Sequence, residues 1–322
     1  MYLVIDVGGT FIKYAWMDAA GKIQDSGKIP TMREQSDTIE DFIETIGKIY
    51  DGYKDKDAVE GIAIDVPGQV DVATGMVYNG GAIHYLDGVN LEKLLGERCD
   101  GKKVAVENDA KCAALAEVWM GHAKNVDNAV VLIFGTGLGG GIIIDRKVHH
   151  GSRMVAGELS WAISDMSRDH LEHLVPESQL DTVEDKFDAW SYLNTTCCGT
   201  AALVHRVAKA KGLKDGEVSG ELIYEWAFAG DEIAIRELED TYFSIAKLCM
   251  NMYVTLDPDV ILIGGGISEQ PEFLRGIQRY VDKIKTIADI YSGIRLDVCK
   301  YRNRSNLLGA LYNFKQKYGM ID

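Results

Sequence analysis

Apolar residues in this chain gather into short blocks, separated by glycine turns and by segments with helical spacing. The clearest block is 129–145, AVVLIFGTGLGGGIIID, in which an apolar run enters a glycine cluster and leaves it as a second apolar run. Branched and aromatic residues favour strands, and glycine allows a tight turn. The pattern therefore predicts a strand, a glycine turn and a second strand.

The N-terminal stretch 2–18, YLVIDVGGTFIKYAWMD, follows the same plan. Two copies of one hairpin suggest a duplicated fold, in which each half offers a glycine turn to phosphate groups. Peptide N–H groups in such a turn can approach an anion closely because no side chains intervene. Within the first copy, the alternating strand favours a solvated side chain for Lys13, and a phosphate contact is the alternative. A pair of glycine-rich hairpins without a ligand is the alternative.

Apolar residues at helical spacing predict helices that cover these strands, and residues 162–190 are expected to be polar and irregular. The alternation of strands and helices predicts the α/β class. Helices are expected at 36–50, 90–96, 111–122, 200–211, 220–229, 232–255, 272–288 and 307–318, and further strands at 23–30, 59–66, 103–106, 260–263 and 295–298.

Gly135, Gly137 and Gly140 also match the G-x-G-x-x-G motif of dinucleotide-binding proteins. That motif opens a helix, whose N-terminus holds the pyrophosphate. Here three isoleucines follow Gly141, and they favour a strand. A nicotinamide-dependent oxidoreductase is therefore kept as an alternative that the sequence context contradicts.

Composition narrows the possible partners. The 322 residues fit about two domains. The formal net charge of −15, without a compensating Lys/Arg cluster, disfavours nucleic acid and anionic membranes. No apolar run approaches the roughly 20 residues of a membrane span, so a cytoplasmic location is expected. The six cysteines are scattered without a C-x-x-C motif, which indicates neither a disulfide framework nor a zinc cage.

Six short motifs occur in an order that resembles the ROK family of sugar kinases and repressors. They are D-V-G-G-T at 6–10, V-P-G at 66–68, E-N-D-A at 107–110, G-T-G-L-G-G-G at 135–141, A-G-E at 156–158 and P-D-V-I-L-I-G-G-G at 258–266. The resemblance covers most of the chain. It implies the actin-like, hexokinase-like ATPase fold, which is related to ribonuclease H and has two α/β domains with an interdomain cleft.

The expected domains follow from the pattern and from this resemblance. An N-terminal α/β sugar and phosphate domain is expected at 1–117, joined by the C-terminal helix 306–322. A C-terminal α/β nucleotide-binding domain is expected at 118–305. The family's repressors carry a DNA-binding segment before the first hairpin, and none is expected here because the chain begins at that hairpin.

The resemblance implies a kinase that transfers the γ-phosphoryl group of ATP to a hydroxyl, expected to be O6, of a hexose or a hexose-containing glycoside. Asp109 matches the family's catalytic aspartate, and a carboxylate at a strand end suits the acceptance of a hydroxyl proton. A helix N-cap is the alternative role. Gly68, Asn108 and Glu158 match positions that contact the sugar.

The same resemblance implies a nucleotide site with Mg²⁺. Asp6 is expected to hold the ion through water, because Mg²⁺ prefers oxygen ligands and keeps several waters. The expected phosphate and nucleotide contacts come from three glycine turns: Gly8, Gly9, Thr10, Gly135, Thr136, Gly137, Gly264, Gly265 and Gly266.

One departure from the family pattern concerns zinc. Ser160–Trp161 stands where zinc-bearing members have Gly-His, and no cysteine cluster follows. We therefore expect no structural zinc, and we interpret His170 and His173 as surface residues. The chain is similar to the zinc-free branch with glucokinase-like and β-glucoside kinases, in which Trp161 would stack on a sugar face or lie in the core.

The resemblance also implies a homodimer. The sequence leaves open which sugar is used: glucose, fructose, a mannose derivative or a β-glucoside. A catalytically silent sugar or nucleotide sensor with the same fold is a further alternative. The presence of Asp109 argues against a sensor, because a sensor needs no base at that position.

Overall fold

The structure is a computed structural model that describes residues 1–32, 34, 36–53, 55, 58–81, 83–135, 137–301 and 304–320. The chain divides into two compact units. Unit 1 consists of Met1–Lys124, Lys147–Ala156 and Asn303–Asp322, and unit 2 consists of Asn125–Arg146 and Gly157–Arg302. Each unit therefore contains segments that are distant in the sequence.

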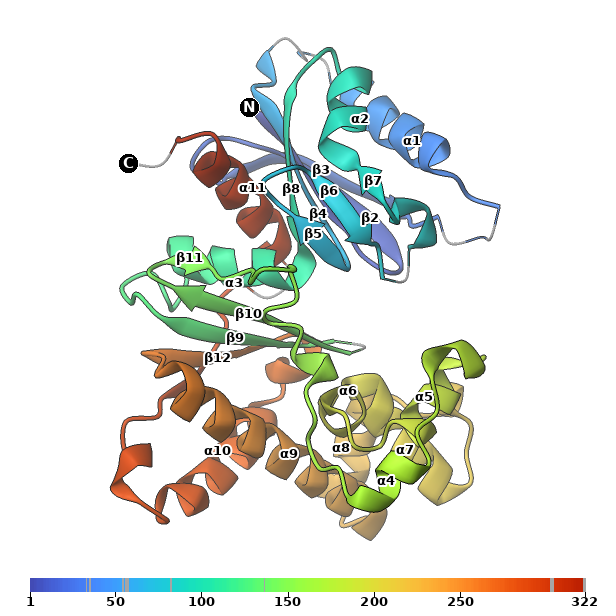
Figure 1. Ribbon diagram of the computed structural model, residues 1–322, viewed down its shortest axis with the longest axis vertical. Helices are drawn as coiled ribbons and strands as arrows, with labels where there is room; N and C mark the ends of the chain where they lie inside the picture. The colour runs from blue at the N-terminus through green and yellow to red at the C-terminus, as the bar shows by residue number, and fades with distance from the viewer. Residues whose placement is uncertain are drawn as a thin grey trace. The chain divides into compact units, whose positions relative to one another are not determined.

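A sheet with the strand order β3-β2-β1-β4-β8 forms the centre of unit 1 (Figure 1). β1 (Tyr2–Val7), β2 (Phe11–Met17) and β3 (Ile23–Pro30) form an antiparallel meander. β4 (Gly61–Val66) and β8 (Lys103–Asn108) continue the sheet on the other side of β1 and run parallel to it. The first predicted hairpin is thus confirmed.

The two faces of this sheet are covered by different helices, because alternate side chains of a strand point to opposite faces. On one face, Ile5 belongs to the core cluster shared with α1 (Ile39–Asp51) and α2 (Leu91–Arg98). On the other face, the ring of Tyr2 lies 5.3 Å from that of Phe314. α1 begins later than predicted, because the Thr38 side chain caps it.

The second face is covered by α11 (Ser305–Lys317), which packs against β1, β4 and β8 and against α3 (Asp109–Met120). The C-terminal helix of the chain therefore completes the core of unit 1. The remaining elements of this unit are short: β5 (Gln69–Asp71), β6 (Met76–Asn79), η2 (His84–Leu86), β7 (Val89–Asn90) and β11 (Lys147–Val148).

Unit 2 repeats the hairpin of unit 1. β9 (Ala129–Phe134) and β10 (Leu138–Ile144) are antiparallel, which confirms the second predicted hairpin. β12 (Val260–Gly264) runs parallel to β9, and β13 (Leu296–Val298) runs parallel to β12. Both units therefore contain an antiparallel hairpin whose first strand also pairs with a parallel strand: β1 pairs with β4, and β9 pairs with β12. This repetition is expected of a duplicated fold.

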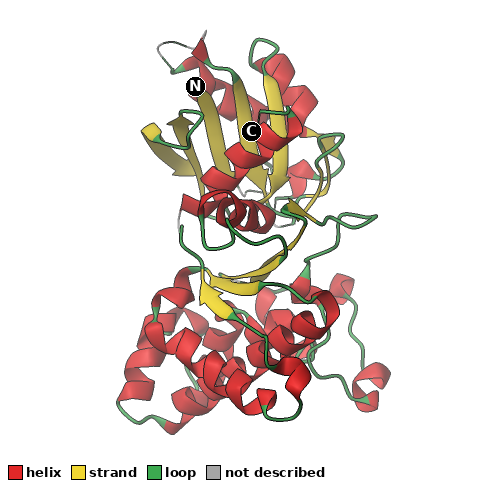
Figure 2. Ribbon diagram, turned by 90° about the vertical axis from the view of Figure 1, so that its left-hand side faces the viewer, coloured by secondary structure: helices red, strands yellow, loops and turns green. Residues whose placement is uncertain are grey.

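The helices of unit 2 gather on one side of its strands, as Figure 2 shows. The predicted helices at 200–211, 220–229, 232–255 and 272–288 are confirmed with small shifts at their ends. Their bounds, with those of the short helices, are η3 (Leu159–Trp161), α4 (Arg168–Glu172), η4 (Glu177–Gln179), α5 (Val183–Ala189), α6 (Asn194–Cys198), α7 (Thr200–Lys211), η5 (Asp215–Glu217), α8 (Gly220–Phe228), α9 (Glu232–Leu256), η6 (Gly266–Glu269), α10 (Pro271–Lys285) and η7 (Asp289–Tyr291).

Residues 162–190 are irregular only in part, since they contain the short helices α4, η4 and α5. The prediction rested on a high content of polar residues, which here cap helices. In α5, for example, the Thr182 hydroxyl accepts a hydrogen bond from the Asp185 N–H, and the Asp185 carboxylate accepts one from the Thr182 N–H. Within the described ranges, no helix combines the length and the apolar character that a bilayer crossing requires.

The contact between α3 and α11 generates a first prediction. A Cβ at Gly309 would lie 1.7 Å from the Cys112 carbonyl oxygen, so any side chain must force the two helices apart. We expect Gly309→Ala to lower the free energy of unfolding by about 1–3 kcal/mol. Thermal and denaturant unfolding measure the effect, with Gly216→Ala as the control because its Cβ would meet nothing within 4 Å. Equal stability of both variants would contradict this account of the packing.

Candidate active site

Three carboxylates form a row across the sheet of unit 1. Asp6 of β1 is the register partner of Asp65 of β4, and Asp65 is the register partner of Glu107 of β8. Register partners in a sheet point to the same face, so the three side chains lie side by side. All three are buried, and a buried carboxylate requires hydrogen-bond donors or a positive charge nearby.

Asp6 has two such partners. The Lys13 ammonium lies 3.0 Å from Asp6 Oδ2, and the Asn306 side-chain amide donates to Asp6 Oδ1 at 3.3 Å. Lys13 is exposed to solvent as predicted, with 44% of its side chain accessible, and it also pairs with Asp6. The sequence could not predict this pairing, because the alternation of side chains along β2 does not show which residue of β1 lies opposite Lys13.

Asp65 lacks such compensation. Its side chain is fully buried, and neither carboxylate oxygen has a hydrogen-bond donor among the described residues. Burial raises the pKa of Asp65 well above its usual range, and the charges of Asp6 and Asp109 raise it further. Sequence reasoning missed this residue. The available signal was an acidic residue inside the apolar strand segment VEGIAIDV.

Glu107 is held by the second segment of unit 1, Lys147–Ala156. His150 Nε2 lies 2.7 Å from Glu107 Oε2, and Glu107 Oε1 accepts a hydrogen bond from the Asn108 N–H. His150 belongs to the segment after β11, so this contact ties that segment to the end of β8. The partner of Glu107 was also missed, because the two residues lie 43 positions apart in the sequence.

Asn108 and Asp109 lie where β8 ends and α3 begins. The Asn108 side chain caps the helix by accepting from the Lys111 N–H at 3.1 Å, and it donates to the Gly68 carbonyl at 3.0 Å. Gly68 has φ +93°, and a Cβ there would lie 1.9 Å from the Asn79 carbonyl oxygen. The predicted sugar-contacting residues Gly68, Asn108 and Asp109 are therefore neighbours in unit 1.

Asp109 is the first residue of α3, and its Oδ1 accepts a hydrogen bond from the Ala110 N–H at 2.8 Å. The N-terminus of a helix favours a negative charge. The helix N-cap is Asn108, so the alternative interpretation of Asp109 as the cap is wrong. The partly exposed Asp109 carboxylate lies close enough to Asp65 to act on its charge.

The predicted phosphate contacts of unit 1 lie in the turn between β1 and β2. The Gly8 N–H donates to the Phe11 carbonyl at 3.1 Å, which closes the turn. The Thr31 hydroxyl donates to the Gly8 carbonyl at 2.6 Å and anchors the turn from the end of β3. Gly9 and Thr10 are exposed at the tip of the turn.

Unit 2 contains a cavity of about 590 Å³ beside the predicted nucleotide glycines. Gly135 and Gly266 line it, together with Glu221 and Tyr224 of α8. The backbone at both glycines is open, since an added Cβ would meet nothing within 4 Å. The cavity therefore brings the second and third glycine turns together.

The other predicted glycines of unit 2 have different surroundings. A Cβ at Gly264 would lie 2.7 Å from Cys299 Sγ, and at Gly265, with φ +93°, 2.0 Å from the Phe134 carbonyl oxygen. These two positions require glycine for close packing. The Gly137 carbonyl accepts from the Gly135 N–H at 3.0 Å, and Thr136 lies outside the described residues.

Glu158 precedes the short helix η3, which ends at Trp161. The Trp161 N–H donates to the Glu158 carbonyl at 3.1 Å, so the two residues belong to one turn. The Trp161 side chain is 55% exposed, and its ring lies 5.5 Å from that of Trp190. Trp161 is therefore a surface aromatic residue and not part of the core.

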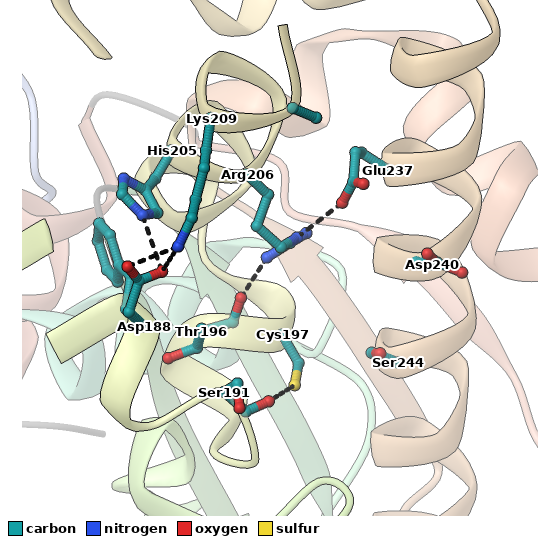
Figure 3. Close-up of a pocket in the computed structure, with 12 residues that line it drawn as sticks. Asp188, Ser191, Thr196, Cys197, His205, Arg206, Lys209, Glu237, Asp240 and Ser244 are labelled. Carbon is teal, nitrogen blue, oxygen red and sulfur yellow. Dashed lines mark hydrogen bonds and ion pairs between the residues drawn. The ribbon is translucent and has the colours of Figure 1, made fainter. Parts of the chain in front are cut away.

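A second cavity of unit 2, which was not foreseen from the sequence, lies between α5, α6, α7 and α9 and has a volume of about 470 Å³ (Figure 3). Its cationic side chains are paired with carboxylates. Lys209 lies 2.6 Å from Asp188, and Arg206 lies 3.1 Å from Glu237. These pairs leave the cavity without the excess positive charge that a phosphate group would require.

Asp6, the residue predicted to hold Mg²⁺, has a carboxylate oxygen ligand of the kind that this ion prefers, and both of its oxygens contact side chains of unit 1. In the described part of the chain, no group of three or more His, Cys, Asp or Glu side chains is arranged to hold a metal ion. His170 instead accepts a hydrogen bond from the Ser167 N–H through Nδ1 at the start of α4.

The paired hairpins with parallel neighbours, and the glycine turns at their strand ends, define an α/β protein of the actin-like, hexokinase-like ATPase class. The model of the ROK family matches residues 2–317. The chain therefore belongs to the ROK family, and both the predicted family and the predicted fold class are confirmed.

Named relatives span nearly the whole chain. A β-glucoside kinase of Klebsiella pneumoniae is 31% identical over 98% of this chain and 97% of its own length. A glucokinase of Halalkalibacterium halodurans is 26% identical over 100% of this chain and 97% of its own. A crystal structure of a ROK family protein from Streptococcus pneumoniae TIGR4 in complex with sucrose superposes with a TM-score of 0.81, at 27% identity and 99% coverage of both chains. Together they support an ATP-dependent sugar kinase.

The contact of His150 with Glu107 gives a second prediction. His150→Ala would remove a partner from a buried carboxylate, and we expect it to lower the free energy of unfolding by about 1–3 kcal/mol. Denaturant unfolding measures the change. The control is His149→Ala, because His149 is the exposed neighbour and most surface substitutions change stability by less than about 0.5 kcal/mol. Indistinguishable midpoints for the two variants would refute a stabilising role of the contact.

Proposed function

We propose that the protein transfers the γ-phosphoryl group of ATP to a hydroxyl, O6, of the hexose unit of a β-glucoside, with Asp109 as the general base. The observation that carries the proposal is the carboxylate of Asp109 at the end of β8 and the start of α3, next to Gly68 and Asn108. A sugar hydroxyl is a weak nucleophile. A carboxylate within hydrogen-bond reach accepts its proton as the phosphorus atom is attacked.

The surrounding residues have consistent proposed roles. Asn108 uses one donor and one acceptor within the chain, which leaves further hydrogen-bonding capacity of its amide for a sugar hydroxyl. The backbone of Gly68 and the carboxylate of Glu158 are the other proposed sugar contacts. Asn108 is fixed by the helix it caps, so the sugar would meet a rigid group.

ATP is proposed to bind the cavity lined by Gly135 and Gly266, which has the size of a small-molecule site. The exposed turn with Gly8, Gly9 and Thr10 would contribute further phosphate contacts. Asp6 would hold Mg²⁺, which when bound offsets the negative charge of phosphoryl oxygens. The residues 118–305 would then form the nucleotide domain, and 1–117 with 306–322 the sugar domain.

The β-glucoside as substrate class is supported by the Klebsiella relative and by the exposed Trp161. An aromatic ring covers the apolar face of a sugar ring, and an exposed ring three residues after Glu158 suits the second ring of a disaccharide. The glucokinase relative favours glucose as the alternative substrate. We also propose a homodimer and a cytoplasmic location.

The substrate proposal is tested with a panel of sugars. We expect cellobiose and other β-glucosides to stimulate ADP formation more than glucose, fructose or mannose derivatives do. Trp161→Ala should raise KM for cellobiose about three- to tenfold, as expected for about 1 kcal/mol of stacking, with a smaller effect on glucose. Phe228→Ala is the control, because Phe228 is an exposed aromatic residue on α8. If no sugar stimulates ADP formation above background, the kinase proposal fails.

Asp109→Asn tests the general base. The amide keeps the size of the side chain but cannot accept the proton, so we expect kcat to fall by about 10²–10⁴-fold while ADP affinity is retained. Steady-state kinetics and ADP titration measure the two quantities. Asp25→Asn, which alters an exposed carboxylate on β3, is the matched control. An Asp109→Asn enzyme with the kcat of the control would rule out this role.

A further inference from the structure

His150 lies outside the six sequence motifs, but its side chain reaches the end of β8. Its Nε2 atom lies 2.7 Å from Oε2 of Glu107, and the two side chains are 18% and 1% exposed. An ionised carboxylate can only accept hydrogen bonds, so the imidazole N–H is the donor of this pair. Because hydrogen bonds to a charged acceptor are short and strong, this contact fixes the Glu107 carboxylate in one orientation.

The other oxygen of Glu107 holds the next residue of the chain. Oε1 accepts a hydrogen bond from the Asn108 N–H at 2.7 Å. The Asn108 side chain in turn donates to the Gly68 carbonyl at 3.0 Å and caps α3. Asp109, the proposed general base, directly follows Asn108 in the chain. The hydrogen bonds that begin at His150 therefore end at the residues proposed to bind and activate the sugar.

The loop that carries His150 is itself anchored within unit 1. β11, which precedes the loop, packs against α3. The His150 carbonyl accepts a hydrogen bond from the Ala156 N–H at 3.1 Å, which closes the loop 150–156. The Gln69 side chain of β5 donates to the Arg153 carbonyl within this loop. The backbone therefore presents the imidazole from a fixed position.

We propose that His150 is a positioning residue of the acceptor-sugar site, which acts through Glu107 to hold Asn108 and Asp109 in the orientation that the sugar hydroxyl requires. The inference rests on the proposed kinase function and adds a residue that none of the motifs contains. His150 is not a sugar contact in this proposal. A group behind the site affects the reaction because a misplacement of about 1 Å can cost about 10²-fold in rate.

Two substitutions of His150 separate its hydrogen bond from its packing. His150→Leu removes the donor but keeps an apolar side chain of moderate size, whereas the amide of His150→Gln can still donate to Glu107. Steady-state kinetics of the full-length protein measure kcat and the KM for cellobiose, glucose and ATP. We expect His150→Leu to raise the sugar KM about five- to thirtyfold. His150→Gln should recover most of this loss.

The KM for ATP should stay unchanged in both variants, because the cavity proposed for ATP is lined by residues of unit 2. A general loss of structure would instead impair both substrates. His149→Leu is the matched control, since His149 is the exposed neighbour of His150. All assays are run at a temperature at which thermal unfolding shows that each variant is folded.

A double-mutant cycle tests whether His150 acts through Glu107. An amide has one accepting oxygen, so Glu107→Gln cannot accept from both His150 and the Asn108 N–H. Glu107→Gln alone should therefore raise the sugar KM as His150→Leu does. The double variant should have the sugar KM of the more impaired single variant, because effects within one network are not additive. Glu107→Gln also carries the measurement if His150→Leu does not fold.

The outcomes distinguish the inference from the proposed function. A folded His150→Leu enzyme with the sugar KM of the wild type would overturn the inference, and so would equal rises in KM for the sugar and for ATP. Additive effects in the cycle would overturn the path through Glu107. A wild-type protein that forms no ADP with any sugar would contradict the proposed kinase function, and the inference with it.

Discussion

The register between β1, β4 and β8 is the constraint on which the chemistry of unit 1 depends. It aligns Asp6, Asp65 and Glu107 in one row on the face that α11 covers. A shift of one residue would turn these side chains to the opposite face and bring apolar residues in their place. The apolar residues of the other face, packed against α1 and α2, therefore fix the position of the carboxylates.

Glycine turns were the most informative part of the sequence. The isoleucines after Gly141 distinguished a hairpin from a dinucleotide motif. Their strand propensity and the position of the glycine turn both predicted a second strand after the turn, and β10 is that strand. Gly68 and Gly265 show the physical basis of two family motifs, since both combine a positive φ with a backbone oxygen about 2 Å from any Cβ. Local sequence was sufficient there because the requirement for glycine is itself local.

The partners of the charged residues could not be predicted in the same way. Lys13 with Asp6, and His150 with Glu107, are contacts across the sheet or between distant segments, and a period along one strand contains no information about them. Asp65 could have been noticed as an acidic residue in an apolar strand, but its lack of donors is a property of the packed core. The short helices after residue 162 were missed because polar capping residues resemble a loop in composition.

The duplication explains why the two units contribute different chemistry from one architecture. When the two hairpins are aligned, Asp6 of β1 corresponds to Ile133 of β9. The parallel partner of Asp6 is Asp65 of β4, and the parallel partner of Ile133 is Gly264 of β12. Gly264 therefore stands where unit 1 has Asp65. The acidic pair of unit 1 is thus replaced in unit 2 by an apolar residue and a closely packed glycine. Without buried charge to compensate, the strand ends of unit 2 can open onto a cavity lined by backbone, whereas those of unit 1 carry carboxylates. The corresponding strand ends therefore carry buried carboxylates in unit 1 and border a glycine-lined cavity in unit 2.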